Sequence, residues 1–218
     1  LRQVYKELNA DAFSEVYVAR GFFDQRYYKD GSMEGPGNYR DSSKFKKAAE
    51  EEGISFIILD DYKKISNNLY ATGTVERVVE KYNGPKGFYL DKDLTIPDII
   101  RDDQSVGMLT DNGWIMMSGC GHSGIINTAM KLQSIKNEPV YGAIGGFHLF
   151  KASDNTISTT ANWLKDNGLT KFMGGHCTGI YAAETIADII GITRENLSHT
   201  AIGSVLTKEL KIIRSSVE

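Results

Sequence analysis

The chain has 218 residues, a formal net charge of −3, a hydrophobic fraction of 41% and a charged fraction of 24%. This length allows a substantial core, and the composition is that of an ordinary globular protein. The nearly balanced charge, with no basic cluster, gives no sign of binding to nucleic acid or to an anionic membrane, and no apolar run approaches the roughly 20 residues that cross a bilayer. Two cysteines make no disulfide framework for a chain of this size, so we expect a cytoplasmic protein.

The N-terminal half of the chain has few regular patterns. Its first eight residues have the apolar spacing of a helix interior and no initiator Met, so we expect the chain to start within a longer protein. Residues 20–41 are rich in glycine and proline and are expected to form a long surface loop. The other expected elements are a strand over 15–19, a helix from Ser42 or Ser43 to Glu52, strands over 54–59 and 68–75, and an irregular stretch over 83–101.

The C-terminal half is more regular. Two strands, 104–110 and 114–118, are expected to form a hairpin about the sequence Asp-Asn-Gly. Strands and helices then alternate, which favours a sheet covered by helices with its site in the loops that follow the strands. The expected elements are helices over 124–136, 154–167 and 179–190, and strands over 140–145, 171–174 and 198–206.

Three of the four histidines lie in similar glycine-rich frames, each after an apolar run and before a predicted helix. They are His122, His148 and His176, separated by about one strand–helix unit each. Imidazoles delivered to equivalent strand ends are expected to meet in space, and the simplest chemistry for such a cluster is a metal centre. We predict that His122 and His176 are metal ligands. His148 is either a third ligand or a catalytic group that contacts the substrate.

Asp103 begins the first hairpin strand, beside the end of the second strand and therefore near His122. It is expected either to orient an imidazole as part of the catalytic machinery or to be a solvated residue at a strand start. Cys120 and Cys177 are expected to be small residues packed next to the site. His199 lacks the glycine-rich frame and is expected to be structural.

Four motifs together resemble the metallo-β-lactamase superfamily, in particular its dihydropterin-ribofuranosylaminobenzene phosphate synthase-like branch. They are Asp-Asp-Gln (102–104), Ser-Gly-Cys-Gly-His-Ser-Gly-Ile-Ile-Asn-Thr (118–128), Gly-Gly-Phe-His-Leu (145–149) and Gly-His-Cys-Thr-Gly (175–179). The resemblance implies an α+β fold, the αββα four-layer sandwich, of which this chain forms mainly the C-terminal two-thirds as a single domain over 1–218. It also implies two divalent metal ions, zinc with iron or manganese as alternatives. His122 and His176 match family ligands, whereas many relatives have an aspartate in place of His148.

The family's main signature, His-x-His-x-Asp-His, is absent, since no two histidines lie within six residues of each other. In the family this motif precedes the helix that the first residues resemble. We therefore expect the domain to be N-terminally incomplete, with the remaining ligands supplied by an N-terminal segment of the same fold, in the same or another chain. A degenerate relative without metal is the alternative.

The resemblance predicts a metal-dependent hydrolase in which metal-activated water attacks a phosphoester or acyl group of a small molecule, suggested to be phosphorylated. We expect the chain by itself to be inactive without the missing motif. One alternative is a non-catalytic relative that acts as a binding or scaffold protein. Another is a mononuclear structural zinc protein, which fits less well because structural sites are usually richer in cysteine.

Overall fold

A computed structural model describes residues 7, 14–30, 32–34, 41–81, 86–207 and 209–214. The expected first helix falls mostly outside these residues. The chain separates into two compact units, one comprising Leu1–Asp61 and Tyr82–Asp102 and the other comprising Tyr62–Lys81 and Asp103–Glu218. Whether the two units act as the single expected domain stays a prediction.

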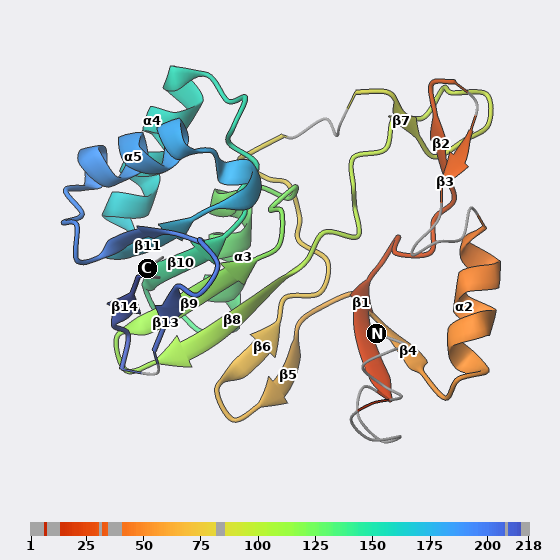
Figure 1. Ribbon diagram of the computed structural model, residues 1–218, viewed down its shortest axis with the longest axis horizontal. Coiled ribbons are helices and arrows are strands. Elements are labelled where there is room, and N and C mark those ends of the chain that lie inside the picture. The colour runs from red at the N-terminus through yellow and green to blue at the C-terminus, as the bar shows by residue number, and fades with distance from the viewer. Residues whose placement is uncertain are drawn as a thin grey trace. The chain divides into compact units, whose positions relative to one another are not determined.

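The first unit has a parallel strand pair and a small antiparallel sheet (Figure 1). Strand β1 (Glu15–Ala19) pairs with β4 (Ser55–Leu59), and helix α2 (Ser42–Glu50) lies between them in sequence. The helix begins as expected, but its N-cap is Asp41, whose carboxylate accepts hydrogen bonds from the backbone N–H groups of Ser43 and Lys44. The antiparallel sheet consists of β2 (Arg26–Tyr28), β3 (Met33–Glu34) and β7 (Phe88–Tyr89), which the sequence patterns did not predict.

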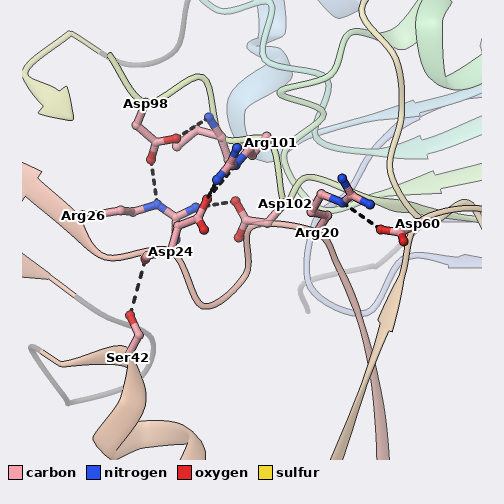
Figure 2. A network of polar contacts seen from close by, with 9 residues as sticks. Arg20, Asp24, Arg26, Ser42, Asp60, Asp98, Arg101 and Asp102 are labelled. Atoms are coloured by element: carbon pink, nitrogen blue, oxygen red, sulfur yellow. Dashed lines mark hydrogen bonds and ion pairs between the residues drawn. The ribbon is translucent and has the colours of Figure 1, made fainter. Parts of the chain in front are cut away.

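Arg26 joins separate segments of this first unit (Figure 2). Its Nε donates a hydrogen bond to Asp98 Oδ2 at 2.6 Å, and its Nη2 donates to Asp102. The Asp98 side chain is fully buried. A buried carboxylate needs such a partner, since the free-energy cost of leaving it unpaired is several kcal/mol, about 3–5. A second pair, Arg101 with Asp24, links the same segments at 2.5 Å.

The second unit is built on a seven-stranded mixed sheet (Figure 1). The two strands of the predicted hairpin are antiparallel, and the second of them is parallel to the three sheet strands that follow it in sequence. In spatial order the strands are β12 (Leu197–His199), β11 (Lys171–Gly174), β10 (Val140–Gly145), β9 (Gly113–Ser118), β8 (Ser105–Thr110), β6 (Leu69–Ala71) and β5 (Lys63–Ser66).

Helices α3 (Ile125–Ile135) and α5 (Ile180–Ile190) pack on this sheet, and α4 (Asp154–Asp166) packs against both of these helices. A fully buried cluster joins them, with Trp114 and Phe172 from the strands and Leu132, Ile157 and Ile186 from the helices. Burial of such side chains is the main favourable contribution to stability, about 1.5–3 kcal/mol for each large side chain. The rigid sheet therefore supports the loops that follow its strands.

The C-terminal end departs from the predicted long strand over 198–206. Strand β12 ends at His199, and a turn with Gly203 at φ +86° precedes β13 (Val205–Leu206), which pairs with β14 (Ile212–Ile213). No helix within the described parts of the chain has the length and apolarity needed to cross a membrane.

The parallel strands end level with one another. Gly145 at the end of β10 lies opposite Ser118 of β9 on one side and Gly174 of β11 on the other. Gly145 has φ +119°, and a Cβ there would lie 1.9 Å from the carbonyl oxygen of Ser118. Only glycine fits this close approach of two strand ends.

We therefore expect Gly145→Ala to lower the free energy of unfolding by about 3 kcal/mol or more, from backbone strain and the steric clash together. Gly191→Ala is the matched control, because Gly191 also has a positive φ, +82°, but no atom would contact its Cβ within 4 Å. Its expected cost is only about 1–2 kcal/mol. Urea unfolding compares the two variants, and equal losses would contradict the role assigned to the strand-end contact.

Glu80 caps the first turn of α3. Its Oε2 accepts hydrogen bonds from the backbone N–H groups of Ile126 and Asn127, at 2.7 and 3.2 Å. Burial raises the pKa of the Glu80 carboxyl, and the hydrogen bonds from the helix backbone oppose that rise in part. The N-terminus of α3 is therefore satisfied by the protein itself.

Because the pKa of Glu80 is raised in the folded state, its contribution to stability is fully present below its ordinary pKa and is lost as pH rises through the raised value. We expect Glu80→Gln, which keeps an acceptor for the helix, to reduce this loss. Glu80→Ala removes the cap and should cost about 1 kcal/mol. Urea unfolding from pH 4 to 8 tests this. A wild-type free energy of unfolding that rises throughout this range, with the same dependence on pH in Glu80→Gln, would contradict it.

Candidate metal centre

The structure brings the three predicted histidines together in the second unit. His122 lies between β9 and α3, His148 follows β10, and His176 begins a short 3₁₀ turn after β11. The ring centroids of His122 and His148 are 4.4 Å apart. Cys120 Sγ lies 3.8 Å from His148 Nδ1 and 3.9 Å from His176 Nδ1. Two imidazoles, those of His148 and His176, thus lie beside one thiol, and the ring of His122 lies against that of His148. The role of the three histidines as metal ligands stays a prediction.

The backbone at two of these histidines is in the left-handed region. His148 has φ +49° and His176 has φ +50°. This conformation is uncommon for a residue with a side chain, and it costs of order 1–3 kcal/mol, so it persists only where the surroundings impose it. It occurs here at the two turns that aim imidazoles at the cluster, which is typical of a functional site.

Two residues after β11 fix the turn that carries His148. The Cys177 thiol donates a hydrogen bond to the carbonyl of Cys120 at 3.0 Å, and its sulfur accepts one from the backbone N–H of His148 at 3.2 Å. The fully buried hydroxyl of Thr178 accepts from the N–H of Phe147 and donates to the carbonyl of Gly145, both at 3.1 Å. These bonds connect the loops after all three strands.

Burial lowers the pKa of His148, and the charges of His122, His176 and Lys151 lower it further, whereas Asp103 opposes the shift. The neutral imidazole is therefore favoured, and this is the form that binds metals. Burial raises the pKa of the Cys120 thiol to about 12, with further contributions from Cys177 and from the Asp103 carboxylate. Without a cation, Cys120 is a protonated thiol.

The two neighbouring aspartates have separate roles. Asp102 pairs with Arg26 in the first unit. Asp103 Oδ2 accepts a hydrogen bond from the backbone N–H of Ser123 at 2.8 Å, which places its carboxylate one residue from His122, at the position expected from the hairpin. Its expected catalytic role stays a prediction. His199 lies in β12 with Nδ1 3.2 Å from the carbonyl oxygen of Gly174, which is consistent with a structural role.

From the sequence, the two cysteines were expected only to pack beside the histidine cluster. In the structure their sulfur atoms are 3.1 Å apart. Among the described residues, Cys120, His148 and Cys177 form a group whose donor atoms all lie within 4.8 Å of one another. The signal that could have identified this group is that each cysteine lies within two positions of a histidine in its motif, Cys120 near His122 and Cys177 next to His176. Sulfur and imidazole donors suit a divalent transition metal such as zinc, so the residues present fit the expected kind of cofactor.

Comparison with a solved structure identifies the fold that carries these loops. The fold is similar to that of Tm1679, a metal-dependent hydrolase of the β-lactamase superfamily, with a TM-score of 0.66 at 22% sequence identity, over 81% of this chain and 65% of that structure. The chain has a metallo-β-lactamase fold. The predicted fold class is thereby confirmed, and the second unit supplies one mixed sheet of that fold.

Two proteins of Methanocaldococcus jannaschii are similar in sequence. One is 7,8-dihydropterin-6-methyl-4-(beta-D-ribofuranosyl)-aminobenzene-5'-phosphate synthase, 33% identical over 188 residues, which are 84% of this chain and 61% of that protein. The other is the uncharacterized protein MJ0448, 31% identical over 135 residues, which are 61% of this chain and 48% of that protein. The resemblance inferred from the motifs is confirmed. The chain spans about half to three-fifths of these relatives, and no family model matches it.

The Thr178 hydroxyl offers a test of how the His148 turn is held. We expect Thr178→Val to lower the free energy of unfolding by about 1–3 kcal/mol, because the buried N–H of Phe147 loses its acceptor. Thr178→Ser keeps the hydroxyl and should cost clearly less. Denaturant titration measures the free energy of unfolding that each variant loses. Equal losses in Thr178→Val and Thr178→Ser would show that the side chain acts through packing and not through its hydrogen bonds.

Proposed function

We propose that this chain contributes the C-terminal ligands of a metal-dependent hydrolase centre that acts on a phosphoester or acyl bond. The observation that carries the proposal is the convergence of three imidazoles at the level ends of three parallel strands. His122, His148 and His176 would hold the metal. When bound, a divalent metal acts as a Lewis acid, which polarises a phosphoryl or carbonyl oxygen and makes water more acidic.

The chain's own groups orient the reactants. Asp103, through its bond to Ser123, places a negative charge beside the imidazoles and favours their interaction with a cation. Helix α5 begins after Gly179 and has no side-chain cap, in contrast to α3, whose first turn is bonded to Glu80. The first N–H groups of α5 follow His176 closely in sequence, and such groups stabilise a phosphate or a developing oxyanion.

A small phosphorylated molecule is the substrate class that we favour. The support is the name of one relative, a synthase of a ribofuranosyl-aminobenzene phosphate compound, together with the start of α5, which has no side-chain cap. That name also supports a second candidate reaction, in which the same centre assists synthesis rather than hydrolysis. A cytoplasmic location, where thiols stay reduced, suits both candidates.

Three imidazoles are too few to bind two metal ions firmly. We therefore propose that a segment with the His-x-His-x-Asp-His pattern, from the same or another chain, supplies the other ligands. On this proposal the described chain alone binds at most one ion and has no hydrolase activity. A non-catalytic binding or scaffold protein of the same fold would need no metal at all.

The test is the metal content of purified, zinc-loaded protein, measured by plasma mass spectrometry. We expect up to one zinc per chain, strongly reduced in His122→Ala and His176→Ala, and 10–100-fold weaker affinity in Asp103→Asn. His199→Asn, outside the cluster, is the matched control and should bind normally. Adding a segment with the missing motif should raise the content towards two ions and allow hydrolysis of a nitrophenyl phosphodiester or ester.

A folded chain that binds no zinc, with or without that segment, would contradict the proposal and favour the scaffold alternative. Normal zinc content in both histidine variants would show that the metal binds elsewhere. Metal at two ions per protein without hydrolysis of either probe would favour the synthesis reaction.

A further inference from the structure

The two thiols are the least expected feature of the site. The chain has only two cysteines, and they come from loops 57 residues apart, yet their sulfur atoms are 3.1 Å from each other. Both are half-buried and neither forms a disulfide. Each follows the end of a parallel strand, Cys120 after β9 and Cys177 after β11, so the level strand ends that gather the histidines gather the thiols too.

We propose that Cys120 and Cys177 bind a divalent ion as thiolates, together with His148, and that the centre therefore selects zinc over manganese. This rests on the proposed function in assuming a metal centre at these loops; it adds two sulfur donors to the imidazoles named there and specifies the metal class. Each thiol gives its proton to water as its sulfur binds the ion.

The distances agree with such a site. A tetrahedral ion with bonds of about 2.3 Å to sulfur and 2.0–2.1 Å to nitrogen holds its ligand atoms roughly 3.5–3.8 Å apart. Cys120 Sγ and His148 Nδ1 are 3.8 Å apart, and the three donor atoms lie within 4.8 Å of one another. The two sulfurs, at 3.1 Å, need to separate by roughly 0.6 Å to reach this spacing, which small side-chain rotations achieve.

The surroundings support a bound thiolate. The backbone N–H of His148 already donates to Cys177 Sγ at 3.2 Å, and a negatively charged sulfur strengthens such a bond. Two sulfurs and one imidazole leave the fourth position of a tetrahedral ion open, which is the arrangement of catalytic rather than structural zinc sites. His176 Nδ1 lies 3.9 Å from Cys120 Sγ, so this imidazole is available as a further donor.

The donor set also determines which metal is preferred. Thiolates are soft ligands that favour zinc, whereas manganese favours carboxylate and water oxygens. A centre of imidazoles and carboxylates alone discriminates less between zinc and manganese. Selectivity for zinc is therefore a property that separates a sulfur-containing centre from the histidine centre of the proposed function.

Cobalt substitution tests the proposal directly, because a cobalt–thiolate bond gives a charge-transfer band in the near ultraviolet that imidazole does not. The reduced full chain is titrated with Co²⁺. We expect one equivalent to produce the band, Cys120→Ser and Cys177→Ser to weaken it, and the double variant to lose it. His199→Asn is the matched control and should keep the full band.

A second measurement uses only the wild-type chain, so its result does not depend on whether the cysteine variants fold. The wild-type chain is treated with a thiol reagent, with and without one equivalent of Zn²⁺. We expect two reactive thiols without zinc and strong protection of both with zinc, but no protection by the same concentration of Mn²⁺.

Stoichiometric cobalt binding without the charge-transfer band would overturn the thiolate proposal and leave the histidine centre of the proposed function intact. Unprotected thiols in the zinc-loaded chain would do the same. A pair that is already oxidised under mild conditions, with a mass lower by two hydrogens and no free thiol, would instead assign the cysteines to a disulfide. No binding of cobalt or zinc at all would contradict both proposals.

Discussion

The level ends of parallel strands β9, β10 and β11 are the constraint on which the site depends. Their register sets Ser118, Gly145 and Gly174 side by side, so every residue a few positions further along falls within one small region. The strained turns at His148 and His176 then aim side chains inward, at a free-energy cost that the buried core and the hydrogen bonds of Cys177 and Thr178 offset. The cluster is therefore a consequence of sheet geometry rather than of any single contact.

Much of the second unit could be predicted from the sequence because its patterns are strong. The hairpin around its Asp-Asn-Gly turn, the apolar runs of β10 and β11, and the amphipathic helices all lie close to their expected bounds. In the first unit the expected strands over 15–19 and 54–59 are present as β1 and β4. Strands β2, β3 and β7 could not be predicted, because strands of two or three residues depend on distant partners and have no periodicity. The single strand predicted over 198–206 overlooked Gly203, whose positive φ places it in the turn that breaks the strand.

The sequence also predicted where the site lies but not all of its chemistry. The glycine-rich frames around His122, His148 and His176 indicated convergence, and the hairpin placed Asp103 beside them. What could not be predicted was the contact between the two sulfurs, since cysteines 57 residues apart reveal no partner until the strand register is known. The bonding of Glu80 to the start of α3 was equally hidden, because that carboxylate comes from a loop without a motif.

The most direct test of the account is a crystal structure of the zinc-loaded chain with an anomalous difference map collected at the zinc absorption edge. The account predicts one zinc peak among the loops that follow β9, β10 and β11, in contact with imidazole nitrogen and with sulfur at about 2.3 Å. A peak at another place, or imidazole rings that point away from one another around an empty region, would contradict it.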